Sequence, residues 1–219
     1  MNCQKFIAGL NSEMSLKIER AISLLKDGGI IAYPTDTVYG VGACFDNLTA
    51  VKRVYQVKNR PMHIPFPLLL SDVSWIEKIT SSIPDVAYQL INSFLPGGLT
   101  LVLKKADSIS HILSAGKDTI AVRIPDHPVT IALINGIEKP LIGTSANVSG
   151  KPSALTASDV YNQLGNKIDY ILDGGKCPGG KESSIVDVTG NIPVLLREGV
   201  ISKEQIEKVC RLIIPAEEI

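Results

Sequence analysis

The sequence contains no long uninterrupted apolar run, although 45% of its 219 residues are hydrophobic. No run approaches the roughly 18 apolar residues that a helix needs to cross a bilayer. A transmembrane chain is therefore excluded, and no membrane partner is expected. Instead, this length and hydrophobic content are enough for one large α/β domain with a sizeable core.

The chain also lacks an excess of charge of either sign, because 22 Lys and Arg residues balance 22 Asp and Glu residues. A neutral chain has no global attraction for nucleic acid or for a membrane surface. Any polyanionic partner must therefore use a local patch. Residues 47–71 offer one, since they contain no acid but include Lys52, Arg53, Lys58 and Arg60.

Signals for export and for metal binding are missing as well. Cys3, Cys44, Cys177 and Cys210 form no C-x-x-C pair, and the first 20 residues lack the charged-then-apolar pattern of a secretory signal. The three histidines show no ligand spacing, so no metal site is expected. These absences predict a cytoplasmic protein with reduced thiols.

Helical and strand patterns alternate along the chain, which predicts a mixed α/β sheet with helices packed on it. One domain is expected over residues 15–201, followed by a C-terminal helix and tail over 202–219. The expected helices are 15–29, 47–58, 84–95, 128–136, 156–165 and one from Ser202. The expected strands are 30–33, 66–70, 99–105, 119–125, 140–145, 169–173, 184–189 and 193–197.

Two familiar motifs are only partly matched. Residues 175–181 fit G-x-x-x-x-G-K, but Glu182 follows where a phosphate-binding loop needs Ser or Thr, and a strand pattern comes next instead of a helix. The segment "GTSAN" begins like a nucleophile elbow, yet Asn147 replaces the second glycine. A Walker nucleotide site and a serine hydrolase are therefore both disfavoured.

Cations and hydroxyls stand at the ends of the expected elements, where α/β folds assemble ligand sites. The segment "YPTDTVYG" (residues 33–40) carries more hydroxyls than turn chemistry requires. Lys58 and Arg60 are expected to project from the loop after a helix. Arg123 lies inside the apolar strand "TIAVRIP", where a guanidinium is costly unless it meets an anion. A site for an anionic ligand is predicted.

Seven motifs in order resemble those of the YrdC-type threonylcarbamoyl-AMP synthases: "YPTDTVYGVGA", "VKNRP", "LPGGLTLVL", "TIAVRIPDHP", "TSANVSGKPS", "DGG" and "ESSIVDVT...LLREG". The resemblance runs from about Ser15 to Ile201. It implies a single YrdC/RibB-like domain, with a twisted mixed sheet and helices around a basic concave cavity. It also implies an enzyme that converts L-threonine, bicarbonate and ATP into threonylcarbamoyl-AMP and pyrophosphate. Partner proteins then pass the activated group to an adenosine in tRNA.

The resemblance also implies roles for particular residues. Thr35, Arg123 and Ser183 match the threonine-binding positions, with Arg123 facing the carboxylate as a bidentate fork. Three neighbours of Thr35 are expected to support the threonine-binding residues: Asp36, Thr37 and Tyr39. Tyr39 is equally compatible with a core position.

On the nucleotide side, Lys58 and Arg60 match residues that grip phosphates and are assigned as catalytic. The other nucleotide-binding positions are Ser145, Asn147, Ser153 and Arg197. A magnesium ion is expected to accompany ATP. No general base is evident, and carboxylation of the amine by proximity alone is one possibility.

Departures from the family pattern keep alternatives open. Leu69 stands where many members carry a histidine near the amino-acid pocket, and Asn59 replaces a common glycine, so the amino-acid substrate is not fixed by sequence. A paralogue of the YciO kind, or a carbamoyl-adenylate-forming domain as in hydrogenase maturation, would share the fold. A non-catalytic RNA-binding module, holding RNA by its phosphates, is the alternative of a different class. The enzyme is expected to bind free RNA only weakly, with an affinity that falls as salt rises.

Overall fold

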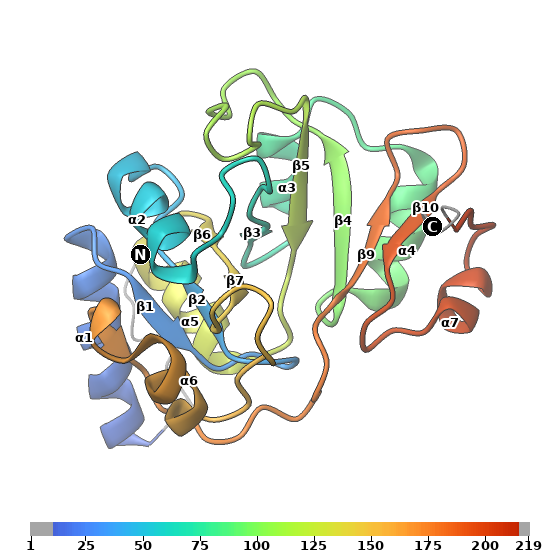
Figure 1. The fold of residues 1–219 in the computed structure, drawn as a ribbon. Coiled ribbons are helices and arrows are strands. Elements are labelled where there is room, and N and C mark those ends of the chain that lie inside the picture. Colours follow the sequence, from blue (N-terminus) through green and yellow to red (C-terminus); the bar gives the residue numbers. More distant parts are fainter. Residues whose placement is uncertain (1–10, 215–219) are drawn as a thin grey trace.

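The computed structural model describes residues 11–214, and Figure 1 shows their arrangement. The helices are α1 (Ser12–Lys26), α2 (Leu48–Lys58), α3 (Ser74–Ile79), α4 (Asp85–Phe94), α5 (Pro128–Ile137), α6 (Ala157–Leu164) and α7 (Lys203–Glu207), with a 3₁₀ turn, η2 (Gly165–Lys167), after α6. The strands are β1 (Ile31–Tyr33), β2 (Gly40–Gly42), β3 (Leu68–Leu69), β4 (Leu99–Lys104), β5 (Thr119–Arg123), β6 (Leu141–Ile142), β7 (Thr144–Ser145), β8 (Tyr170–Ile171), β9 (Ser184–Asp187) and β10 (Val194–Arg197).

The strands form two sheets. The smaller has the order β7-β2-β1-β8 and the larger the order β10-β9-β4-β5-β3-β6. Both are mixed: β1 pairs antiparallel with β2 but parallel with β8, and β4 pairs antiparallel with β5 but parallel with β9. The expected mixed α/β class is confirmed, although the strands divide between two sheets.

The two sheets join where the chain passes from β6 to β7 across Gly143. Beside this crossing, Ile142 N–H donates to the carbonyl of Ala43 over 2.9 Å, so the chain after β2 pairs with the edge of the larger sheet. A Cβ at Gly42 would lie 1.7 Å from the Ile142 carbonyl oxygen, so only glycine permits this approach. The junction fixes one sheet against the other.

Helices cover the outer faces of the sheets (Figure 1). In the smaller half, α1 buries Ile18 and Leu25 in one apolar cluster with Leu133 of α5. Side-chain caps set the helix starts, because Asn11 accepts from Met14 N–H before α1 and Asn47 accepts from Ala50 N–H before α2. In the larger half, α3 lies behind β5 and α4 lies behind β9 and β10 in Figure 1, which leaves the opposite face of these strands available for a site.

One strand and one α-helix were not expected from the sequence. β2 lies within the stretch interpreted as a polar turn and its continuation, and α3 follows the turn at Asp72, whose Oδ1 accepts from Ser74 N–H. The helix expected from Ser202 is present as α7, and Ser202 caps it. No helix within residues 11–214 combines the length and apolar character needed to span a membrane.

Candidate active site

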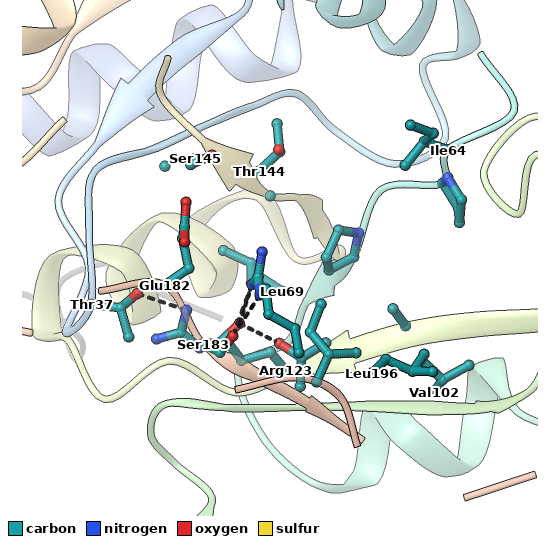
Figure 2. A pocket seen from close by; sticks show the side chains of 18 of the residues that line it. Thr37, Ile64, Leu69, Val102, Arg123, Thr144, Ser145, Glu182, Ser183 and Leu196 are labelled. Atoms are coloured by element: carbon teal, nitrogen blue, oxygen red, sulfur yellow. Dashed lines mark hydrogen bonds between the residues drawn. The ribbon is translucent and has the colours of Figure 1, made fainter. Parts of the chain in front are cut away.

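A cavity of about 350 Å³ lies between the two sheets (Figure 2). One wall is the exposed face of the larger sheet. Alternate residues of its strands point to opposite faces, so Leu99, Leu101 and Leu103 of β4 are buried in the core. Their neighbours on the other face line the cavity, as do the corresponding residues of β5, of β9 and of the position just before β9: Thr100, Val102, Thr119, Ala121, Arg123, Ser183, Ile185 and Asp187.

The opposite wall comes from loops and from the smaller sheet. Its lining residues follow β1, α2 and β6, and they are Thr35, Thr37, Val38, Tyr39, Gly40, Arg60, Ile64, Pro65, Pro67, Gly143, Thr144 and Ser145. Leu69 of β3, in the larger sheet, also lines the cavity. Glu182, Leu196, Arg197 and Lys117 complete the cavity. Motifs that are far apart in sequence therefore meet at one place.

Arg123 is the most fully engaged cation of the lining. Its Nε donates to the Gly97 carbonyl over 2.9 Å, one Nη to Thr37 Oγ1 over 2.9 Å, and the other Nη to Asp36 Oδ1 over 2.6 Å. The anion expected from sequence is thus supplied by Asp36 of the same chain. A guanidinium carries five N–H groups, so two remain for a ligand in the cavity.

The hydroxyls of the predicted threonine pocket are held in buried pairs. Thr35 Oγ1 donates to the Val38 carbonyl over 2.7 Å and lies 3.0 Å from Thr37 Oγ1. Ser183 Oγ lies 2.8 Å from Thr100 Oγ1. The structure brings Thr35, Ser183 and Arg123 to the same cavity. Thr100 was missed because the motif "LPGGLTLVL" gives no sign that its threonine faces a site.

Arg60 lines the cavity from the loop after α2. Its Nε donates to the Ile64 carbonyl over 3.2 Å and an Nη to the Pro65 carbonyl over 3.0 Å, while the guanidinium lies 5.2 Å from the centre of the Phe66 ring. Burial lowers its pKa. The turn that aims this loop requires Asn59 at φ 53°, ψ 40°, a left-handed conformation that favours Gly and tolerates Asn.

Lys58 does not project from a loop, and this expectation was wrong. It is the last residue of α2, is 1% exposed, and is not among the lining residues. Its Nζ donates to the Ser145 carbonyl, to the Asn147 carbonyl over 2.8 Å and to Asn147 Oδ1 over 3.1 Å. Burial, with a smaller effect from Arg60, lowers the pKa of Lys58 to about 7. The lysine holds the end of β7, which carries Ser145, and the residues after it against α2.

The other predicted nucleotide residues divide into two groups. Ser145 and Arg197 line the cavity, whereas Asn147 and Ser153 lie behind it. Asn147 is 5% exposed and uses its side chain to accept from Lys58 and to donate to the Lys151 carbonyl. Ser153 Oγ donates to Glu182 Oε1. Asn147 and Ser153 thus hold in place the loop formed by the motif "TSANVSGKPS".

Arg197 and Glu182 close the cavity at one end. Arg197 donates through Nε and Nη2 to the Ser183 carbonyl over 3.0 and 2.8 Å. Burial lowers the pKa of Arg197, and the negative charge of Glu182 opposes this effect. Glu182 was not singled out as a site residue, because its neighbour in space, Ser153, is 29 positions away. Figure 2 shows its carboxylate directed into the cavity.

Leu69, which stands at the position of a family histidine, is 4% exposed and lines the cavity. Its side chain fills the space beside Gly143, where a Cβ would lie 2.5 Å from Leu69 Cγ. This corner of the cavity is therefore apolar. Tyr39, for which support and core roles were both open, belongs to the core cluster and also lines the cavity, and its hydroxyl donates to the Gly175 carbonyl over 2.8 Å.

Comparison with known proteins defines the class. Residues 23–199 match the Sua5/YciO/YrdC family model, described as telomere recombination. The chain belongs to this family. The threonylcarbamoyl-AMP synthase of Bacillus subtilis (strain 168) is 41% identical over 213 residues, which cover 95% of this chain and 62% of that protein.

Solved structures of proteins from this family resemble the chain. The crystal structure of Pyrococcus abyssi Sua5 complexed with L-threonine matches with a TM-score of 0.86 and 40% identity, covering 90% of this chain and 58% of that one. Escherichia coli YciO matches with a TM-score of 0.78 and 28% identity, covering 87% and 92% of the two chains. The YrdC-like fold is thereby established. The chain spans about three fifths of the length of the Bacillus and Pyrococcus proteins.

Proposed function

We propose that the chain is an L-threonylcarbamoyl-AMP synthase. The observation that carries the proposal is the convergence of Arg123, Ser183 and Arg60 on one cavity, because these residues belong to three separate family motifs. The relatives named threonylcarbamoyl-AMP synthase, at up to 41% identity, favour this activity over that of a YciO-like protein or an RNA-binding module.

The reaction has two steps. The threonine nitrogen and bicarbonate first give N-carboxythreonine and water. A carboxylate oxygen of this carbamate then attacks the α-phosphorus of ATP, and pyrophosphate leaves with the electrons of the broken P–O bond. The products are threonylcarbamoyl-AMP and pyrophosphate.

The binding roles follow from charge and geometry. Two free N–H groups of Arg123 suit the threonine carboxylate, while the buried hydroxyls of Thr35 and Ser183 suit its polar atoms. Arg60 and Arg197 line the cavity with N–H groups that have no acceptor within residues 11–214, so they suit phosphate oxygens. Fixed cations of this kind stabilise charge that develops in phosphoryl transfer.

Lys58 and Asn147 support the same step indirectly, by holding the backbone that carries Ser145. Magnesium is proposed to arrive with ATP as part of the substrate, where it neutralises charge on the phosphates. Among residues 11–214 no group of three or more His, Cys, Asp or Glu side chains is suited to a metal ion, which fits an ion held mainly by phosphates. Transfer to tRNA by partner proteins, and a cytoplasmic location, complete the proposal.

The test is pyrophosphate release from ATP, magnesium and bicarbonate by the purified chain. L-threonine should give the highest rate, serine a lower one and valine the lowest, because valine leaves buried hydroxyls without partners. Because Leu69 makes one corner of the cavity apolar, the ranking tests whether the site still selects an amino acid with a hydroxyl. Release driven by carbamoyl phosphate instead of threonine would assign the hydrogenase-maturation type of activity. Absence of release with either, together with tight, salt-resistant RNA binding, would favour the RNA module.

A further inference from the structure

The first step of the proposed reaction requires a proton acceptor. An α-amino group has a pKa of about 7.7–8.0 in model peptides, so it is largely protonated near neutral pH. Its nitrogen cannot attack carbon until the ammonium loses a proton. A side chain that removes this proton must be ionised and must reach the cavity that holds the amino acid.

Carboxylates near the cavity differ in how far they are committed to other groups. Asp36 is paired with Arg123 at 2.6 Å, and the two side chains are 15% and 7% exposed. Asp187 Oδ1 accepts from both the backbone N–H and the hydroxyl of Thr189. Glu182 accepts through Oε1 from Ser153, and within the described chain no donor is bonded to Oε2. Asp36 Oδ2 and Asp187 Oδ2 likewise have no donor within the described chain, so position distinguishes the three carboxylates. Asp36 does not line the cavity, and Asp187 lies four residues beyond Ser183 at the far end of β9. Glu182 lines the cavity directly beside Ser183 and has one oxygen open to a ligand.

The position of Glu182 matches the predicted threonine pocket. It directly precedes Ser183, and its backbone carbonyl accepts from Val200 N–H over 2.9 Å, which fixes this segment against the β10–α7 connection. Figure 2 shows its carboxylate in the cavity with Thr37, Ser183 and Arg123. With the carboxylate of threonine at Arg123, the amine sits on the adjacent carbon atom, in the cavity that Glu182 also lines.

Two cations lie near Glu182. Burial lowers the pKa values of Lys58 and Arg197, and the charge of Glu182 raises both, so the carboxylate is within electrostatic range of each.

We propose that Glu182 is the general base that deprotonates the threonine ammonium, a role that rests on the synthase activity proposed above. The carboxylate takes one proton from nitrogen. The nitrogen lone pair then forms a bond to the bicarbonate carbon while the C–OH bond breaks. The departing hydroxide takes the proton from Glu182 and becomes water, which regenerates the carboxylate. The second amine proton passes to solvent, leaving N-carboxythreonine.

The experiment compares Glu182→Gln and Glu182→Asp with wild type in two directions. In the forward direction, pyrophosphate release by Glu182→Gln is expected to fall at least about 100-fold at pH 7, the usual contribution of a positioned base. The deficit should shrink as the pH rises towards 9.5, because solution then deprotonates the amine. Glu182→Asp retains a carboxylate and should keep an intermediate rate.

The reverse direction starts from threonylcarbamoyl-AMP and pyrophosphate and is followed as ATP formation. It bypasses the first step, because the carbamate that forms decomposes in solution after release. Both variants are therefore expected to form ATP within about threefold of the wild-type rate. Glu198→Gln, at an exposed glutamate that does not line the cavity, is the matched control and should equal wild type in both directions.

The outcomes separate the two proposals. A wild-type chain that releases no pyrophosphate with threonine overturns the synthase assignment itself. An active wild type with an equally active Glu182→Gln variant overturns only the role of Glu182. Equal losses in both directions, or a deficit that does not change with pH, would also overturn it, since adenylyl transfer or folding would then be affected. Circular dichroism and thermal unfolding check the fold, and the aspartate variant provides the test if the glutamine variant is unfolded.

Discussion

The Arg123 guanidinium and the Asp36 carboxylate form a 2.6 Å ion pair that joins the larger sheet to the loop after β1 of the smaller one. Arg123 lies at the end of β5, and Asp36 lies three residues beyond β1. The pair thus spans the two sides of the cavity. It also orients the N–H groups that remain available for a ligand.

Asp36→Ala is expected to lower the free energy of unfolding by about 3 kcal/mol, because breaking a buried pair leaves a charge without compensation. Denaturant titration measures this loss. Asp46→Ala, which removes the exposed pair with Lys139, is the control and should cost less than about 1 kcal/mol. Equal losses in the two variants would mean that the Arg123 pair is no more important than a surface pair.

Lys58→Ala is expected to reduce both stability and synthase activity. The substitution removes the Lys58 donor from the carbonyls of Ser145 and Asn147, of which Ser145 still accepts from Asn147 N–H, and it opens a cavity, for a combined cost of about 2–4 kcal/mol. Activity falls because the end of β7, which carries Ser145, is no longer held against α2. Lys52→Ala, at an exposed lysine of the same helix, should change the unfolding free energy by less than about 0.5 kcal/mol. Full stability of the Lys58 variant would contradict the buried arrangement.

Gly199→Ala is expected to displace the segment that carries Glu182 and Ser183. A Cβ at Gly199 would lie 2.1 Å from the Glu182 carbonyl oxygen, and relief requires movement of backbone. We expect a loss of about 1–3 kcal/mol in unfolding free energy and a higher KM for threonine. Gly190→Ala meets only the Ile192 carbonyl at 3.9 Å and serves as the control. Unchanged kinetics in the Gly199 variant would show that this contact does not position the site.

Stability should fall in mild acid because of His127. Burial lowers its pKa, with opposing effects from Asp36 and Asp126, and its Nδ1 is buried without a hydrogen-bond partner. The folded chain therefore favours neutral histidine. Below about pH 6.5 the unfolded chain binds a proton that the folded chain resists. Stability is complete above that pH and is lost as the pH falls towards the folded-state pKa.

Urea titrations between pH 5 and 8 measure this dependence. His127→Gln should show a smaller decline than wild type, whereas His111→Gln, at an exposed histidine, should decline as wild type does. Identical profiles for all three proteins would remove His127 as the cause.

The sequence allowed prediction of elements whose pattern is long and regular. β4, β5 and β9 alternate core and cavity residues, and the order of motifs led to Thr35, Arg123 and Ser183 at one site. β2 was missed because three residues with two glycines carry little periodic signal. The direction of Lys58 could not be predicted, because its acceptors are 87 and 89 positions away and their approach depends on tertiary packing. Glu182 was missed for the same reason.

Because the cavity lies between two sheets, binding of a ligand in it should raise the thermal midpoint of unfolding. A ligand that contacts Arg123 on one side and Ser145 on the other is bound only while the sheets are docked. At one hundred times its dissociation constant, such a ligand adds about 2.7 kcal/mol to the stability of the docked state. The thermal midpoint of the chain therefore serves as a readout of cavity ligands, independent of whether they react.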